Sequence, residues 1–224
     1  MNILYGLALE EKEGLGTAYE YYVKLKLLKR VLGKIKIKSV LIYGLPEKYG
    51  YSLDFFFFCK KNNIQCYVYD KRDEKIRELI DILKQLEVFE GFTINVVNKI
   101  DKVYDLVLSC EAMQYLNEKG IKLYINNIKR YSRKTIIFVP NKDNKNHGTL
   151  SGLKSFRLEE LDSLFPKKTE SGYIDMPPFK PGVKMKKKMK NNYLVNLLVL
   201  FAYLERLIPK SIKKGKAHIC YILL

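Results

Sequence analysis

Apolar residues along this chain follow two patterns that alternate with each other. Residues 17–32 carry them at helical spacing, which predicts a helix that ends at Gly33. The stripe expected on its buried face is Tyr22, Leu25, Leu28 and Val31. Runs without polar alternation, which are typical of buried parallel strands, cover residues 38–43, 64–69, 93–97, 104–108 and 134–139. Further helices are predicted over residues 53–61, 70–89, 112–130 and 157–165.

This alternation predicts the layout of the fold. Strands and helices that follow one another favour a mostly parallel sheet with helices on both faces and right-handed connections. Beyond these elements we expect a strand near residues 172–176, a helix over 193–208 and a closing apolar strand within 217–224. The sequence therefore indicates an α/β fold of the doubly wound type.

Composition narrows the class of protein. With 224 residues, 47% of them hydrophobic, we expect a single domain over 1–224 that begins with a helical segment over 1–36. The four cysteines form no CxxC pair and there are only two histidines, so we expect reduced thiols and no metal site. No signal-peptide pattern opens the chain, and residues 193–208 are too short and too polar to span a membrane. These features predict a cytoplasmic protein that is at most peripheral to a membrane.

The positive charge is concentrated near the end of the chain. The formal net charge is +17, and residues 179–224 hold eleven lysines and arginines against the single acid Glu205. Such a localised basic surface attracts phosphate, either on nucleic acid or on lipid. The densest part of the run consists of Lys184, Lys186, Lys187, Lys188 and Lys190.

Three features are expected to meet at one edge of the sheet. In a doubly wound sheet, ligands bind beyond the carboxyl ends of the strands. Gly44 follows the first predicted strand, Asp70 ends the second, and the sequence Ser109-Cys110-Glu111 follows the fourth. Glycine lets the backbone turn close to a ligand, and a carboxylate accepts hydrogen bonds from a ribose diol. Taken singly, the glycine is also consistent with an ordinary turn, and Asp70 with the N-cap of the next helix.

The same segments resemble a known family. VLIYGLPEKYG (40–50), CYVYD (66–70) and YDLVLSCEAMQYL (104–116) are similar to the first, second and fourth signature segments of class I S-adenosylmethionine-dependent methyltransferases. The final AHICYILL resembles that family's seventh strand, which is antiparallel. The resemblance covers nearly the whole chain. It implies a Rossmann-like, mostly parallel seven-stranded sheet with an antiparallel last strand, S-adenosylmethionine as cofactor, and methyl transfer to an acceptor.

The resemblance also assigns roles to residues. It implies that Gly44 and Leu45 line the methionine part of the cofactor, Asp70 holds the ribose, Asn98 contacts the adenine, and Ser109 and Cys110 border the methyl group. The glycine motif departs from the family pattern. Ile42 stands where an acid is usual, Pro46 replaces the second glycine, and the third corresponds to Lys48 or Gly50. The alternative is therefore a methyltransferase-like module that binds no cofactor and acts through its basic tail.

Substrate recognition is expected in the insertion 177–215, between the last two strands. It combines the basic run with the apolar residues 193–208, which suits RNA or an anionic lipid surface as partner. The alternative is that 193–208 packs as core and the lysines form a solvated face. The apolar helix is also the expected contact for a homo-oligomer. If the acceptor needs a general base, the candidates are His147 and Glu111.

Overall fold

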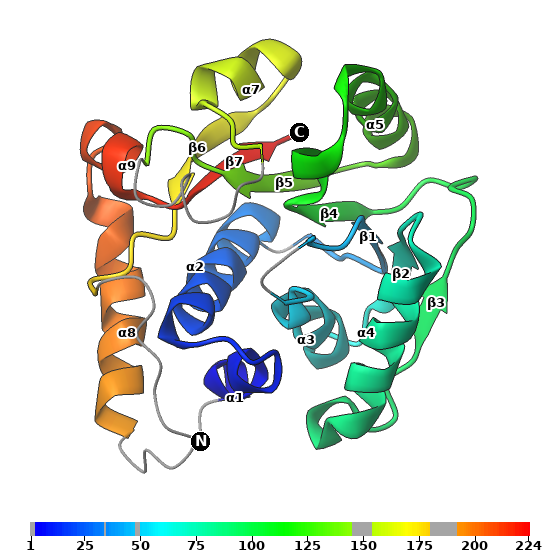
Figure 1. Ribbon diagram of the computed structural model, residues 1–224, viewed down its shortest axis with the longest axis horizontal. Coiled ribbons are helices and arrows are strands. Elements are labelled where there is room, and N and C mark those ends of the chain that lie inside the picture. Colours follow the sequence, from blue (N-terminus) through cyan, green and yellow to red (C-terminus); the bar gives the residue numbers. More distant parts are fainter. Residues whose placement is uncertain (1–2, 34, 48–49, 145–153, 180–191) are drawn as a thin grey trace.

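The computed structural model describes residues 3–33, 35–47, 50–144, 154–179 and 192–224. Its centre is a seven-stranded sheet with the order β3-β2-β1-β4-β5-β7-β6 (Figure 1). The strands are β1 (Ser39–Tyr43), β2 (Gln65–Tyr69), β3 (Ile94–Val96), β4 (Leu106–Cys110), β5 (Thr135–Pro140), β6 (Glu170–Ile174) and β7 (Ile219–Leu223). Neighbouring strands pair in parallel, except that β7 runs antiparallel to both β5 and β6. The predicted doubly wound sheet with an antiparallel last strand is confirmed.

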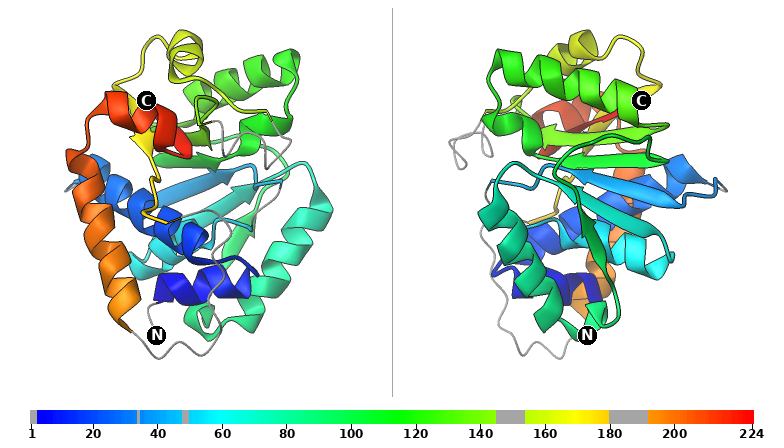
Figure 2. Two further views of the ribbon diagram at one scale, coloured as in Figure 1. Left: turned by 60° about the vertical axis from the view of Figure 1, so that its left-hand side comes forward. Right: turned by 90° about the vertical axis from the view of Figure 1, so that its right-hand side faces the viewer.

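Helices cover both faces of this sheet (Figures 1 and 2). The α-helices are α1 (Ile3–Glu10), α2 (Leu15–Leu32), α3 (Leu53–Lys61), α4 (Asp73–Gln85), α5 (Glu118–Tyr131), α7 (Leu158–Leu164), α8 (Asn192–Leu204) and α9 (Lys210–Lys216). The described residues also form three short 3₁₀ helices, η1 (Glu87–Phe89), η2 (Ala112–Tyr115) and η3 (Glu205–Leu207). None of the helices in the described part of the chain combines the length and the apolar character that a membrane crossing requires.

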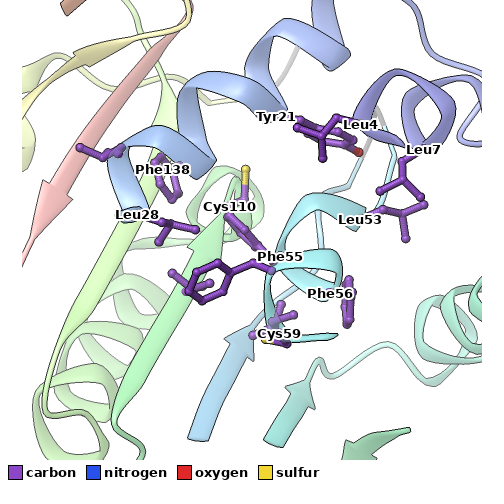
Figure 3. Packing of buried hydrophobic residues seen from close by; sticks show 14 of the residues in the cluster. Leu4, Leu7, Tyr21, Leu28, Leu53, Phe55, Phe56, Cys59, Cys110 and Phe138 are labelled. Atoms are coloured by element: carbon purple, nitrogen blue, oxygen red, sulfur yellow. The ribbon is translucent and has the colours of Figure 1, made fainter. Parts of the chain in front are cut away.

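Alternating side chains divide the core into two layers. Successive residues of a strand point to opposite faces, so Val40 and Ile42 of β1 face helices α1 to α4, while Leu41 and Tyr43 face helices α5 and α7. In the first layer Phe55 of α3 packs beside Phe138 of β5, with ring centroids 5.8 Å apart (Figure 3). Full burial of such a side chain contributes about 1.5–3 kcal/mol.

The structure corrects several sequence-based boundaries. The helix predicted over 112–130 is two elements, because the chain leaves η2 and restarts at α5, where the Asn117 side chain accepts a hydrogen bond from the Gly120 N–H at 2.8 Å. Strand β4 begins and ends two residues later than predicted. The helix predicted over 70–89 is α4 followed by η1.

The buried face of α2 also differs from the predicted stripe. Tyr22, Leu25 and Val31 are only half-buried, and only Leu28 of the four is fully enclosed. Lys24 takes a place in the buried face instead and is 0% exposed. A helix pressed between the sheet and α8 buries more than one stripe, and a charged side chain enters that interior only when acids accompany it.

Candidate functional site

A cavity of about 380 Å³ lies at the carboxyl ends of β1, β2 and β4. This is the edge at which a ligand is expected in a doubly wound sheet. The cavity is lined on the sheet side by Tyr43, Gly44 and Asp70, and on the side of η2 and α5 by Tyr115, Tyr124 and Asn127. Two of the predicted site residues, Gly44 and Asp70, are therefore brought to one cavity.

Gly44 is the turn that ends β1. Its φ is +79°, in the region that side-chain-bearing residues rarely adopt. A Cβ atom at this position would stand 2.5 Å from Cβ of Ala112, so the absence of a side chain also lets η2 approach the strand end. The glycine is required both by the backbone conformation and by this close approach.

Asp70 is almost fully enclosed and fully hydrogen-bonded. Its side chain is 2% exposed. One oxygen, Oδ2, accepts the Leu45 N–H at 2.7 Å and the Arg72 Nη2 at 2.7 Å, and Oδ1 accepts the Arg72 backbone N–H and Nε, both at 2.9 Å. A carboxylate has about four lone-pair sites, so protein donors occupy all of them. Although burial acts to raise the pKa of Asp70, the Arg72 and Leu45 hydrogen bonds outweigh it and hold that pKa below its usual value.

Arg72 closes one side of the cavity. Besides Asp70, its guanidinium donates to the Leu45 carbonyl at 2.6 Å and pairs with Glu47 in the loop after β1. It also lies over the ring of Tyr115, 4.5 Å from the centroid. A ribose diol could reach the Asp70 carboxylate only after this side chain moves. The two-residue spacing of Asp70 and Arg72 was visible in the sequence, but a spacing alone does not show which acid an arginine meets.

Aromatic rings form part of the cavity wall. Tyr43 stacks on Tyr124 with centroids 4.9 Å apart and lies 5.3 Å from Tyr69. Asn127 donates to the Tyr43 hydroxyl at 3.0 Å. Flat π faces beside amide and hydroxyl groups suit a planar heterocycle. Among the residues that line the cavity, the sequence motifs predicted only Gly44 and Asp70. The lining role of the tyrosines and of Asn127 depends on how α5 packs against β1 and β2.

Four other predicted residues do not line this cavity. Leu45 is fully buried and contributes its backbone N–H to Asp70. Gly50 has a φ of +89° and stands against the Glu11 carboxylate. The Ser109 hydroxyl donates to the Tyr43 carbonyl at 2.8 Å, within the sheet. Asn98 is exposed and does not line the cavity. Their assigned roles stay predictions.

Cys110 and Glu111 belong to a buried charged cluster under α2. Lys24 Nζ is 2.8 Å from Glu20, 3.2 Å from Asp54 and 3.7 Å from the Cys110 Sγ; in Figure 3 the sulfur of Cys110 points toward α2. Glu111 has a φ of +59° and is 9% exposed. Burial and the nearby charge of Glu20 raise the pKa of Glu111 to about 8. This carboxyl group therefore carries a proton through much of the neutral range.

His147 lies outside the described residues, and the structure brings forward a different histidine. His218 precedes β7, and its Nδ1 is 3.0 Å from Oδ2 of Asp175, the residue after β6. The sequence held one signal for it, since it is the only other histidine and stands at the start of a predicted strand. Its carboxylate partner is 43 positions away in the chain, so only the tertiary structure reveals the pair.

Comparisons with known proteins relate the chain to others by structure alone. No protein-family model and no curated protein sequence matches it. A SAM dependent methyltransferase from Archaeoglobus fulgidus superposes with a TM-score of 0.54 at 16% identity, covering 90% of this chain and 91% of that one. The plantazolicin methyltransferase BpumL in complex with SAH gives 0.51 at 15% identity, covering 92% and 81%. TehB from Haemophilus influenzae gives 0.52 at 12%, covering 88%, and this chain spans 60% of TehB's length.

At sequence identities of 12–16%, structural similarity establishes the fold of the chain but not its activity. The chain has the Rossmann-like methyltransferase fold, with the strand order and the antiparallel β7 described above. Because a fold hosts many functions, the activity must be argued from the cavity and its residues.

Proposed function

We propose that the protein transfers a methyl group from S-adenosylmethionine to an acceptor. The observation that carries this proposal is the meeting of a positive-φ glycine and an acid, from the ends of β1 and β2, at one aromatic cavity. BpumL, which has the same fold, was solved with SAH. The fold and the cavity together favour methyl transfer over a purely structural role.

The residues present fit the nucleoside half of S-adenosylmethionine. The stacked Tyr43 and Tyr124 offer a flat surface for a purine, and Asp70 offers a carboxylate for the ribose diol once Arg72 moves. Gly44 leaves backbone open at the end of β1, where a side chain would meet Ala112. When bound, the sulfonium supplies an electrophilic methyl group for an in-line displacement. The protein then contributes alignment and the exclusion of water.

Two glycine substitutions test this site. Gly44→Ala and Gly91→Ala both place a Cβ at positive φ, +79° and +70°, which costs about 1–2 kcal/mol each. Only the Cβ at position 44 meets another atom, and overpacking costs about 1–3 kcal/mol more. We expect wild type and Gly91→Ala to bind S-adenosylmethionine and S-adenosylhomocysteine with micromolar affinity in calorimetric titrations, and Gly44→Ala to lose at least tenfold.

Thermal unfolding of both variants, recorded in parallel, separates loss of binding from loss of fold. The absence of binding to the wild-type protein at millimolar ligand, weaker than about −4 kcal/mol, contradicts the proposed function. Equal affinities for the two folded variants would show that the cofactor lies elsewhere.

A second property, attachment to an anionic membrane surface, is favoured by the surface after β6. We propose it because several large apolar side chains of α8 and η3 face outward, among them Leu200 at 52% and Leu207 at 70% exposed. The lysines 184–190, which precede this helix, lie outside the described residues, and each lysine near such a surface contributes about 1 kcal/mol. The predicted homo-oligomer contact through the same helix stays a prediction.

Vesicle sedimentation tests this surface. We expect binding to vesicles that contain phosphatidylserine, weakening as salt rises, and no binding to phosphatidylcholine vesicles. Leu207→Glu should reduce binding at least fivefold, whereas Val103→Glu, at a residue 54% exposed in another region, should not. Salt-dependent RNA binding that ignores Leu207→Glu, without vesicle binding, would point to nucleic acid instead.

A further inference from the structure

A second and larger cavity, of about 660 Å³, opens beside β6 and β7. Its walls come from α2, from the chain after β6, and from α8 and η3. Most of the lining is apolar or aromatic, with Tyr19, Met176, Phe179, Phe201, Ile208 and His218 among its residues. Such a wall favours a ligand with an apolar or aromatic body.

The polar corner of this cavity holds the Asp175–His218 pair. The carboxylate Oδ2 of Asp175 lies 3.0 Å from His218 Nδ1, which fixes the orientation of the imidazole. The His218 side chain is 16% exposed and lines the cavity. A carboxylate that orients an imidazole at the wall of a pocket is the arrangement that a general base requires.

The backbone around this pair is held from several sides. Asp175 has a φ of +69°, which is rare for a residue with a side chain, and such conformations cluster at functional sites. The Asp175 N–H donates to Glu205 at 3.0 Å, and its carbonyl accepts the His218 N–H at 2.8 Å. Glu205 in turn accepts the Tyr19 hydroxyl at 2.6 Å. These hydrogen bonds connect η3, α2 and the ends of β6 and β7 around the carboxylate of Glu205.

This corner lies two strands from the end of β4, at the same edge of the sheet as the proposed methyl-transfer site. The Glu111 N–H donates to the Phe138 carbonyl on β5, and the Asn141 N–H, just beyond β5, donates to the His218 carbonyl. Adjacent strands are about 4.8 Å apart, so β7 starts roughly 10 Å from the end of β4. The charge of Glu20 acts at both places: it adds to the rise in the pKa of Glu111 that burial causes, and it also acts to raise the pKa of His218.

Charged groups around the imidazole set its basicity. Burial lowers the pKa of His218, but the hydrogen bond and charge of Asp175 outweigh it, and Glu20 and Glu205 act in the same direction. The pKa of His218 is therefore raised above 6.5. Lys216 lines the same cavity. A base with a pKa near the working pH is effective because it is partly deprotonated yet still takes up a proton readily.

We infer that the second cavity binds the methyl acceptor, an aromatic or otherwise apolar molecule with a weakly acidic hydroxyl group, and that His218 is its general base. This inference rests on the proposed function. The acceptor O–H gives its proton to His218, and its oxygen forms a bond to the methyl carbon. The bond between that carbon and sulfur breaks, and its electron pair stays on sulfur. The products are a methyl ether, S-adenosylhomocysteine and a protonated His218, which returns the proton to solvent. Asp175 is a positioning residue.

The probe 4-nitrophenol tests the base without the cofactor, because only its phenolate is yellow. At a pH where the free phenol is mostly protonated, wild-type protein should bind the probe and increase the phenolate absorbance. His218→Gln should still bind it, by competition or calorimetry, but lose at least 90% of that increase. Asp175→Asn should lose part of it. His147→Gln tests the other candidate base, and Lys29→Gln, in the exposed last turn of α2, should behave as wild type.

A rate measurement separates a base from a structural residue. With S-adenosylmethionine present, transfer to 4-nitrophenol should fall about 100-fold or more in His218→Gln, and the deficit should shrink at a pH where the phenol is ionised in solution. The inference is overturned if wild type binds no probe, if bound probe stays protonated, or if His147→Gln rather than His218→Gln abolishes the signal. Failure of cofactor titration with the phenolate signal intact would instead overturn the proposed function.

Discussion

Replacing Lys24 by methionine is expected to lower the free energy of unfolding by about 3–5 kcal/mol at neutral pH, because breaking a buried ion pair leaves its partner uncompensated. For a chain of this length that corresponds to a fall of roughly 6–20 °C in melting temperature. The side chains of Lys24 and Asp54 are both 0% exposed, and Glu20 is the second acidic partner of Lys24. Thermal and urea unfolding measure the effect.

The matched control is Lys29→Met, the same substitution in the exposed last turn of α2, which should change stability by no more than about 0.5 kcal/mol. The double variant Lys24→Met/Asp54→Leu should recover much of the loss, since well-packed apolar residues replace a buried pair with little or no destabilisation. If Lys24→Met were as stable as Lys29→Met, the buried pair would not exist in solution.

The buried charged residues around Lys24 also predict how the stability of the protein depends on pH. Burial raises the pKa of Asp54 to about 7, since one lysine does not offset it, and raises that of Glu11 to about 7. For Lys24, burial acts to lower the pKa, but the attraction of Asp54, Cys110 and Glu20 outweighs it, so the ammonium stays charged. Carboxyl groups with raised native pKa values bind more protons when folded, so stability falls as pH rises. We expect this fall between about pH 4 and 8, steeper in Lys24→Met.

The second large effect is expected on the affinity for S-adenosylmethionine, which substitution of Asp70 should lower and substitution of Arg72 should maintain or raise. Asp70→Asn removes the charge that would hold the ribose, and a hydrogen bond to a charged group contributes about 1.5–3 kcal/mol. We therefore expect the affinity for S-adenosylmethionine to fall roughly 10- to 100-fold. Arg72→Met vacates two acceptor sites on Asp70 while leaving the Leu45 and Arg72 backbone N–H bonds in place. Its affinity should equal or exceed that of the wild type. Calorimetric titration measures both.

Asp105→Asn is the matched control for these variants. Asp105 also accepts backbone N–H groups, from Lys38 at 2.9 Å and Ser39 at 3.1 Å, but it stands at the opposite end of β1. It should leave cofactor affinity unchanged. A loss in Arg72→Met as large as that in Asp70→Asn would show that the guanidinium itself contacts the ligand, and an unchanged Asp70→Asn would remove the acid from the site.

The pattern of apolar residues predicts the bounds of an element well where nearly all side chains of that element are apolar. The apolar runs that became β1, β2 and β5 were located within one residue at either end, because strands inside a parallel sheet covered by helices admit few polar side chains. The pattern failed on α2. Its interior position surrounds Lys24 with acids from α2 and α3, and helical periodicity treats any lysine as a surface residue.

The sequence by itself determined the order of strands and helices and the placement of Gly44 and Asp70 at strand ends, which follow from short-range hydrophobic periodicity and from glycine and acid positions along the chain. The antiparallel direction of the last strand was implied by the resemblance to class I methyltransferases. Only the tertiary structure decided that Arg72 occupies the Asp70 carboxylate, that Lys24 is buried among acids, and that Asp175 meets His218 across 43 residues. Contacts of this kind depend on how strands and helices pack at the sheet edge, and no local pattern encodes that packing.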